Sequence, residues 1–529
     1  MTKPWHWRSL PLENRTGAEI FAALFLTTTP SGIATLLESP YPTPTSQPQL
    51  SRYSICAGAP RIIDGVPQMW TPQLGQVFPF LEELLQSRDL GVQGCKGVGE
   101  QIFNSSPAPL PPAPCPLPPH LPFTGGWLGW LGYDVAWEIE QLPFAKSDTL
   151  PFPVAFWYEP ESFAVLDHVE QILWLAGSDI NDVDRLKILL EDKNSGNSLY
   201  QVTSSPHKPI TSAPEFFTSQ SDYETSVNRA KKYIQAGDIF QANLSLRFAA
   251  STTASGWSIY QTLQKINPSP FASYWQTPWG EVVSCSPERL VLLQNQEAQT
   301  RPIAGTRSRG KTPEQDHQLA QELLSNTKER AEHIMLVDLE RNDLGRVCEW
   351  GTVKVDELLT IERYSHVMHL VSNVKGTLQS NQSTVNLIRA MFPGGTITGC
   401  PKVRCMEIIE ELEPVRRSLF YGSCGYLDWR GNLDLNILIR TLLLAPASPS
   451  EGQGAGSREQ GAEEESLTQH SHFNSAQCTA LSTQHSALKT VWGQVGAGIV
   501  ADSDPEREWY ESLHKAQAQL AALNLINHP

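Results

Sequence analysis

Two pairs of glutamates have the type and spacing that suit a divalent cation. Glu329 and Glu332 occur in KERAEH, and Glu508 and Glu511 occur in EREWYE, so each pair is separated by three residues. In a helix such residues share one face, and Mg²⁺ prefers carboxylate oxygens while keeping several waters. Two helices that present one pair each could bind Mg²⁺ and an anionic substrate together. The alternative is a solvated helix face, the commoner fate of charged residues.

Other segments have the chemistry to bind an anion or move a proton. PGGTITG at 393–399 runs into a helix start at Pro401, where free backbone N–H groups attract anions. The glycines of Gly493–Val500 allow a ligand to approach the backbone, although an ordinary tight turn explains either segment equally well. Arg440 ends the apolar strand LNILIRT and is either a fork for a carboxylate or a strand-end charge. His369 is a usable acid or base, or else an ordinary core histidine.

Helices and strands must both be present to position these groups. Apolar periodicity predicts a helix over Asp222–Ala236, and Asp504 with the following proline begins a C-terminal helix. Alternating apolar residues predict a hairpin over Ser162–Gly177, and Gly425–Leu444 reads as two strands around an Arg-Gly-Asn turn. Strands and helices alternate without a regular βαβ period, so we expect an α+β fold.

Composition excludes several classes of protein. The chain has 529 residues, of which 40% are apolar and 18% charged, and its net charge is −16. Such a chain can build a large core, but it lacks the basic character of a nucleic-acid-binding surface. The nine cysteines form no C-x-x-C pair, which favours a reducing, cytoplasmic setting. We expect neither a signal peptide nor a membrane span.

Three segments of biased composition divide the chain. Phe103–Phe123 is rich in proline, and Asp192–Gln220 is rich in small polar residues. The segment 446–486, rich in Gly, Ser and Glu, is predicted to be a disordered insertion between two strands. We therefore expect an N-terminal region over residues 1–200 and a catalytic domain over residues 221–529.

Many consecutive segments resemble the chorismate-utilising enzymes. This family contains the large subunits of anthranilate synthase and aminodeoxychorismate synthase and, more distantly, the isochorismate and salicylate synthases. The similar segments include GDIFQANLSLRF, SCSPERL, RPIAGTRSRG, KERAEHIMLVDLERNDLGRV, FPGGTITGCPK, GYLDWRGNLD and GAGIVADSDPEREWYE. The first third of the chain is similar in fewer places, namely LLES, SRYS and FTGGWLGWLGYD.

The resemblance implies a fold and a set of roles. The fold would be a large β-sandwich with helices packed outside and an active site between its halves. Glu288 would be the general acid that protonates the departing 4-hydroxyl of chorismate. Glu332 and Glu511 would be Mg²⁺ ligands, with Glu329 and Glu508 in the same shell or close behind. The residues implied to line or hold the substrate are His369, Thr396, Tyr426, Arg440, Gly496, Ala497, Gly498 and Lys515.

Two positions bear on which reaction of the family is catalysed. Gln241 stands where isochorismate and salicylate synthases carry a lysine that activates water, so ammonia is the expected nucleophile. Ala304, which precedes Thr306 in the catalytic loop PIAGT, resembles anthranilate synthases, whereas many aminodeoxychorismate synthases carry a lysine there. FTGGWLGWLGYD, QANLS and PGGTITG are more similar to the aminodeoxychorismate branch. We therefore expect formation of 4-amino-4-deoxychorismate for folate synthesis, with anthranilate synthase component I as the alternative.

The resemblance also implies partners beyond chorismate. Leu37, Glu38 and Ser39, with Pro268 and Ser269, resemble the tryptophan site of the family. The sequence has no G-x-C-x-G amidotransferase elbow, so ammonia is expected from a separate glutamine amidotransferase subunit. A catalytically silent tryptophan-binding regulator is a further alternative, which the intact set of acidic residues disfavours.

Overall fold

The computed structural model describes residues 5–26, 32–39, 51–92, 120–191, 210–363, 367–447 and 488–527. Most of the predicted insertion over 446–486 and most of the proline-rich segment 103–123 lie outside the described residues. Among the helices that are described, none is long and apolar enough to cross a membrane.

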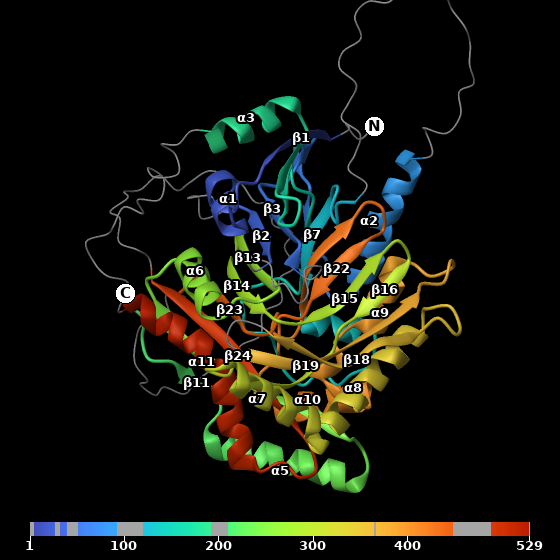
Figure 1. Ribbon diagram of the computed structural model, residues 1–529, viewed down its shortest axis with the longest axis vertical. Coiled ribbons are helices and arrows are strands. Elements are labelled where there is room, and N and C mark those ends of the chain that lie inside the picture. The colour runs from blue at the N-terminus through green and yellow to red at the C-terminus, as the bar shows by residue number, and fades with distance from the viewer. Residues whose placement is uncertain are drawn as a thin grey trace, which may run out of the picture.

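Two large antiparallel sheets form the centre of the molecule (Figure 1). The twelve-stranded sheet runs β1 (His6–Pro11), β10 (Ile172–Gly177), β9 (Ser162–Asp167), β3 (Tyr53–Ala57), β2 (Ala34–Glu38), β13 (Phe271–Thr277), β14 (Gly280–Ser286), β23 (Thr441–Pro446), β24 (Lys489–Ile499), β12 (Gln241–Thr252) and β11 (Glu215–Phe216), with β20 (Gly399–Cys400) beside β12. The ten-stranded sheet runs β17 (Ile303–Ser308), β19 (Val367–Thr377), β16 (Glu297–Thr300), β15 (Arg289–Gln294), β22 (Leu433–Asn436), β21 (Ser423–Asp428), β7 (Gly126–Leu131), β8 (Ala155–Tyr158) and β6 (Met69–Trp70), with β18 (Lys354–Arg363) beside β19. A short ladder joins β4 (Ile62–Ile63) to β5 (Val66–Pro67).

Helices surround these sheets, as Figure 1 shows. They are α1 (Gly17–Leu24), α2 (Val77–Val92), α3 (Ile180–Glu191), α5 (Gln220–Ala236), α6 (Gly256–Ile266), α7 (Pro313–Ser325), α8 (Thr327–Gly345), α9 (Thr384–Met391), α10 (Lys402–Leu412) and α11 (Pro505–Asn527), with 3₁₀ turns η3 (Tyr133–Glu138) and η4 (Gly395–Ile397). The α+β fold with a large sheet core and helices outside is confirmed. Strands from the expected N-terminal region lie in both sheets, where β2 pairs with β13 and β7 pairs with β21.

Alternation along the strands divides the buried side chains into two cores. On β23, Leu443 faces the other sheet, while Leu442 and Leu444 face the outer helices, and all three are fully buried. This period of two is the pattern expected for a strand that is covered on both faces. The inner core holds the sheets together, and the outer core fixes the helices on the twelve-stranded sheet.

Most of the elements expected from the sequence are present. The hairpin over Ser162–Gly177 is confirmed as β9 and β10. The helix over Asp222–Ala236 is confirmed as α5, which ends at Gly237 in the left-handed conformation that glycine favours. The strands around the Arg-Gly-Asn turn are β21 and β22, and the C-terminal helix is α11.

Two of the places where the chain passes from one sheet to the other lie next to each other. One crossing joins β14 to β15 and contains Glu288, and the other joins β22 to β23 and contains Arg440. The crossings bond to each other, since the N–H of Ile437 donates to the carbonyl of Glu288 at 3.0 Å. The expected continuous strand ending at Arg440 is therefore wrong. β22 ends at Asn436, and Arg440 adopts a φ of 50° in the bend that changes sheets.

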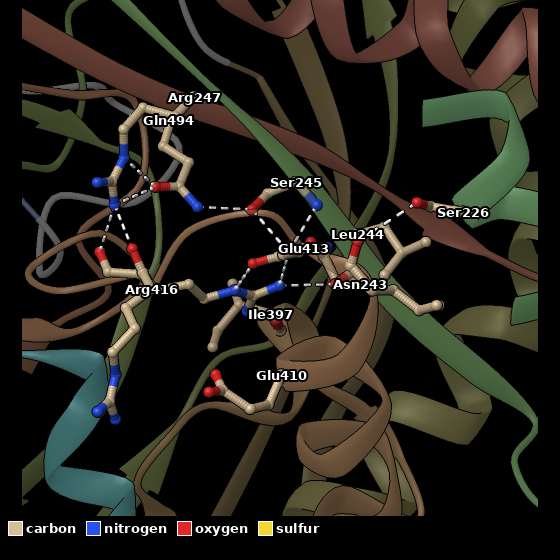
Figure 2. Close-up of polar contacts among 12 residues, drawn as sticks. Ser226, Asn243, Leu244, Ser245, Arg247, Ile397, Glu410, Glu413, Arg416 and Gln494 are labelled. Carbon is tan, nitrogen blue, oxygen red and sulfur yellow. Dashed lines mark hydrogen bonds and ion pairs between the residues drawn. The ribbon is translucent and has the colours of Figure 1, made fainter. Parts of the chain in front are cut away.

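A buried ion pair connects β12 to η4 and to the segment after α10 (Figure 2). Arg417 is 2% exposed and donates to Glu413 at 2.7 Å, to the carbonyl of Ile397 at 2.8 Å and to that of Asn243 at 2.7 Å. Glu413 accepts hydrogen bonds from the N–H and the hydroxyl of Ser245 at 2.8 and 2.7 Å. One pair of side chains thus fixes three separate backbone segments.

A second layer extends this network to β24. Gln494 donates to the Ser245 hydroxyl at 2.7 Å, and its side-chain oxygen accepts from Arg247 at 2.9 and 3.0 Å. Arg247 is 1% exposed and also donates to the carbonyls of Arg416 and Arg417. Because almost every group is paired, the network can hold charges in the core without leaving them unpartnered.

The Arg417–Glu413 pair should be important for stability. We expect Arg417→Met to lower the free energy of unfolding by about 3–5 kcal/mol, because the Glu413 carboxylate is left buried without its partner. Unfolding in urea measures this change. Arg229→Met is the matched control, because its pair with Glu411 is 50% and 39% exposed and such pairs contribute about 0–1 kcal/mol. Equal losses in the two variants would contradict the assigned role.

Candidate functional site

Glu288 occupies the first crossing and is 5% exposed. Burial raises the pKa of its carboxyl to about 7, while the Thr396 hydroxyl, the N–H of Ile303 and the charge of Arg440 favour the ionised form. A carboxyl with a pKa near 7 can hold a proton at neutral pH and deliver it to a leaving group. The structure thus places Glu288, Thr396 and Arg440 together, from three separate segments of the chain.

His369 lies on the other side of this group, on β19. Its Nδ1 is 3.0 Å from the Thr306 hydroxyl, and the ring is 2% exposed. Burial, and next the charge of Arg440, lowers the pKa of His369 to about 3. The imidazole is therefore neutral at physiological pH, which suits it to orienting Thr306 or the substrate rather than to acting as a cationic acid.

Ala304 and Thr306 flank an irregularity in β17. The register against β19 shifts between them, and Gly305 has a φ of 64°. A methyl group on Gly305 would stand 2.7 Å from Oε2 of Glu329, so the loop can pack on this carboxylate only because the residue is glycine. Arg307 then donates to Oε1 of Glu329 at 2.8 Å. The loop thus contacts His369 through Thr306 and Glu329 of the first acidic pair through Arg307.

Gln241 begins β12 and packs against the glycine strand β24. Its side chain is 8% exposed and occupies the space that a Cβ on Gly498 would need. Gly496 lies directly against the backbone of β12, where a side chain would collide with the carbonyl of Leu244. Ala497 is fully buried on the opposite face, toward the outer helices. Glycine at 496 and 498 therefore permits a close approach of two strands and of the amide of Gln241.

Lys515 connects this glycine strand to the second acidic pair. Its ammonium group donates to the carbonyl of Gly496 at 3.1 Å and lies 2.9 Å from the carboxylate of Glu511. The side chain is 45% exposed, so it can exchange these contacts for a ligand at small cost.

The two acidic pairs lie within electrostatic range of each other. Burial raises the pKa of Glu332, and after the opposing charge of Lys328 the next contributions come from Asp502, Glu511 and Glu329. Glu508 is 7% exposed, and burial likewise raises its pKa, with Glu511 adding to the shift. The helices α8 and α11 therefore bring the four glutamates to one region.

This arrangement leaves carboxylate oxygens available to a cation. Oε2 of Glu329 and Oε2 of Glu508 are buried and make no hydrogen bond within the described part of the chain. Across those same residues, no three His, Cys, Asp or Glu side chains are arranged so that they could hold a metal ion. The four glutamates, called the open acidic group below, offer carboxylate oxygens, which are the donor type that Mg²⁺ prefers.

A separate cavity of about 100 Å³ lies between β2, β13 and β21. Leu37, Glu38 and Ser39 line it, as do Arg289 and Asp434, which pair at 2.8 Å. Pro268 and Ser269, the two other residues expected at a tryptophan site, are not among the residues that line the cavity. Ser269 is 3% exposed and bonds to Asn267, and Pro270 and Phe271 form this part of the wall.

Tyr426 also lines this cavity and is 6% exposed. Its ring packs edge-on against Phe123 with centroids 5.5 Å apart. The expectation that Tyr426 holds substrate together with Arg440 is corrected, because β21 directs this side chain into the cavity rather than toward the crossings. Sequence order alone does not distinguish the two faces of this strand.

Tyr421 is a buried residue of the site that sequence reasoning missed. It has a φ of 64°, and its N–H donates to the carbonyl of Leu438 within the second crossing at 3.0 Å. Burial raises the pKa of Tyr421 beyond the range of a titrating phenol, and the Ser245 hydroxyl lies beside it. Ser245 pairs with Gly496 across β12 and β24, so Tyr421 lies beside the residue that is directly opposite Gly496. The only signal in the sequence was an aromatic residue before a glycine in YGSCGY.

The chain is similar to known proteins of one family. The chain matches the family model of chorismate binding enzymes over residues 100–457 and 471–521. It is 58% identical to an anthranilate synthase component I-like protein of a Synechocystis species, over 98% of this chain and 92% of that protein. It is 44% identical to aminodeoxychorismate synthase component 1 of Bacillus subtilis, over 76% of this chain and 78% of that protein.

Two further comparisons concern a second relative from the same organism and a solved structure with the same fold. The chain is 37% identical to anthranilate synthase component 1 of the same Synechocystis strain, over 78% of this chain and 79% of that protein. The crystal structure of anthranilate synthase component I from Streptococcus pneumoniae superposes with a TM-score of 0.64 at 28% identity, covering 89% of this chain and 92% of that one. These matches show that the chain belongs to the chorismate binding enzyme family and is a chorismate-utilising enzyme of the anthranilate and aminodeoxychorismate synthase type.

Proposed function

We propose that this enzyme aminates chorismate with ammonia and forms 4-amino-4-deoxychorismate. The observation that carries the amination is the buried carboxyl of Glu288, whose pKa of about 7 lets it hold a proton where a leaving hydroxyl must be protonated. The proton passes from Glu288 to the 4-hydroxyl, which leaves as water, and ammonia forms the new C–N bond at ring carbon 4. The ammonium group formed in this way then loses one proton, which restores the proton of Glu288. After Glu288 has given up its proton, the Thr396 hydroxyl and the charge of Arg440 stabilise its carboxylate.

The choice of nucleophile follows from two side chains without basic groups. Gln241 is an amide and cannot remove a proton from water, so attack by water has no base at this position. Ala304 presents only a methyl group and leaves space for a small nucleophile. Ammonia meets both conditions, since it needs no activation and little room. We infer that a glutamine amidotransferase subunit supplies it, in keeping with the component numbering of the relatives.

We further propose that Mg²⁺ binds to the open acidic group. Glu332 and Glu511 would hold the ion, with Glu329 and Glu508 beside them, and the unpartnered oxygens of the latter two fit this donor set. When bound, the ion would attract the ring carboxylate of chorismate. Lys515 and the backbone of Gly496 would face the remaining anionic part of the substrate. The cavity lined by Glu38 and Arg289 would take a zwitterionic amino acid such as tryptophan.

The pattern of relatives supports the 4-amino product over anthranilate. Identity is 44% to the aminodeoxychorismate synthase component of Bacillus subtilis but 37% to the anthranilate synthase component of Synechocystis. That Synechocystis strain also encodes the protein that is 58% identical to this chain, so its anthranilate synthase component is a different protein. Anthranilate synthesis is the second candidate, which Ala304 favours.

A product assay separates these candidates. We expect purified protein with chorismate, Mg²⁺ and ammonium to yield a 4-amino product that an added aminodeoxychorismate lyase converts to p-aminobenzoate. Chromatography with fluorescence detection distinguishes this compound from anthranilate. Anthranilate as the major product would replace the proposal by its alternative, and no consumption of chorismate would favour a silent regulator.

Replacing Glu288 with glutamine should remove the proton donor while keeping the shape of the side chain. We expect Glu288→Gln to lower kcat by about 10²–10⁴-fold. The wild-type kcat/KM should fall as pH rises through about 7, because the raised pKa makes the protonated form active below that value and depletes it above. Glu297→Gln, at an exposed glutamate on the ten-stranded sheet, is the control and should leave both properties unchanged. A wild-type profile that stays flat to pH 9 would contradict the role of Glu288.

The Mg²⁺ proposal can be tested with two substitutions on helix α11. We expect Glu508→Gln to raise the Mg²⁺ concentration at half-saturation by roughly tenfold or more, because one buried carboxylate of the group is neutralised. Isothermal titration calorimetry of Mg²⁺ binding gives a readout independent of turnover. Glu506→Gln, exposed and two residues away, should bind Mg²⁺ like the wild type. Unchanged binding in Glu508→Gln would place the ion elsewhere.

A further inference from the structure

Two amide side chains share one face of β12 at its beginning. Gln241 and Asn243 lie two residues apart on this strand, and residues at that spacing point to the same side of a sheet. Gly498 of β24 is next to both. It is the register partner of Asn243, and Nε2 of Gln241 lies 2.3 Å from the position that a Cβ on Gly498 would take. Two amides and a glycine therefore form one small polar surface.

Each of the two amides has an oxygen without a partner. Oε1 of Gln241 and Oδ1 of Asn243 are buried and accept no hydrogen bond from any residue that the structure describes. The Gln241 residue is 8% exposed. Nδ2 of Asn243 donates to the carbonyl of Thr396 at 3.5 Å, and the reverse orientation of this amide would place two oxygens against each other. Oδ1 of Asn243 is therefore directed away from that carbonyl.

The next residue on this face of β12 differs from the two amides. The hydroxyl of Ser245 donates to Glu413 at 2.7 Å and accepts from Gln494 at 2.7 Å, so the fold supplies both of its partners. A buried acceptor that no donor reaches destabilises a fold, and native structures contain few of them. Two such acceptors at neighbouring positions on one face therefore indicate a ligand that supplies the donors.

The chemistry of the two oxygens defines this ligand. An amide oxygen accepts hydrogen bonds and has no proton to give, so the ligand must be a donor and must be small enough for a buried place. Ammonia has three N–H groups and one lone pair. When two of its N–H groups bond to the two oxygens, the lone pair remains free for attack. Water could make the same two bonds, but no side chain in the pair is a base that could remove its proton.

The two amides also lie close to the candidate active site and to the surface. The N–H of Asn243 donates to the carbonyl of Thr398 at 2.9 Å, and its side chain bonds to Thr396, whose hydroxyl stabilises the Glu288 carboxylate. Phe240, which precedes the strand, is 68% exposed. Ammonia that arrives from outside at the start of β12 therefore reaches the amides within one residue of the surface.

We propose that Gln241 and Asn243 form the ammonia subsite of this enzyme, in which the two amide oxygens accept hydrogen bonds from ammonia and direct its lone pair toward chorismate. This subsite rests on the proposed amination of chorismate, but not on which ring carbon receives the nitrogen. It gives Gln241 a positive role in addition to the absence of a base, and it adds Asn243 as a second residue that contacts the nucleophile.

Two substitutions test the subsite with ammonium as the sole source of nitrogen. Asn243→Leu and Gln241→Met keep the approximate size of each side chain and remove the amide oxygen. We expect each to lower kcat/KM for ammonium by about 5–10-fold, as for the loss of one hydrogen bond, and to leave KM for chorismate unchanged. Asn381→Leu, the same change at an exposed asparagine, is the control and should leave both constants unchanged.

Thermal unfolding separates a ligand-binding role from a structural one. Gln241→Met should leave Tm unchanged or raise it, because the oxygen that it removes has no partner in the described fold. A lower Tm, or a rise in KM for chorismate, would overturn the subsite, since the amides would then support the fold or bind the ring substrate. Ammonium-dependent turnover that is equal in wild type and both variants would overturn the subsite alone. A wild-type enzyme whose chorismate consumption does not depend on ammonium would overturn the proposed amination and the subsite together.

Discussion

The candidate active site depends on a constraint of topology, namely that the chain crosses between two sheets twice at the same place. A residue in the middle of a strand has its side chain directed to one face, whereas a residue in a crossing can lie between the sheets. Glu288 and Arg440 occupy the two crossings, and the hydrogen bond from Ile437 to the carbonyl of Glu288 holds the crossings together. An acid and a cation from segments about 150 residues apart in sequence therefore meet without a flexible loop between them.

Burial then shifts the pKa of the residues that lie in and around the crossings. It favours the neutral form of each group, so Glu288 keeps a proton near pH 7 and His369 stays unprotonated. The same effect acts on the acidic residues of α8, but its consequences differ along the helix. Near the start of α8 the carboxylates remain partly open to solvent, as at Glu332, whereas Glu340 is buried and burial raises its pKa to about 8.

The buried network around Arg417 makes this arrangement rigid. It fixes β12, η4 and the segment after α10, which carry Gln241, Thr396 and Tyr421 respectively. The cavity near Glu38 is also connected to the site by short paths. Arg289 follows Glu288 directly and lines the cavity, and Asn267 accepts from Arg440 at 3.4 Å while donating to Ser269. A ligand in the cavity would therefore contact the strand that positions the acid.

Local patterns in the sequence determined the elements and the identity of most reactive residues. Helical spacing placed Glu329, Glu332, Glu508 and Glu511 on two helices, and caps and alternation located α5, α11 and the β9–β10 hairpin. These features depend on neighbouring residues, which a sequence displays directly. The tertiary structure alone decided which side chains meet. It moved Arg440 from a strand end to a crossing, turned Tyr426 into the separate cavity and brought Tyr421 to the second crossing. Contacts between distant segments depend on register and on which face a strand buries, and a one-residue shift reverses that face. Burial follows from the same contacts, so the raised pKa of Glu288 is a property of the fold rather than of the sequence around it.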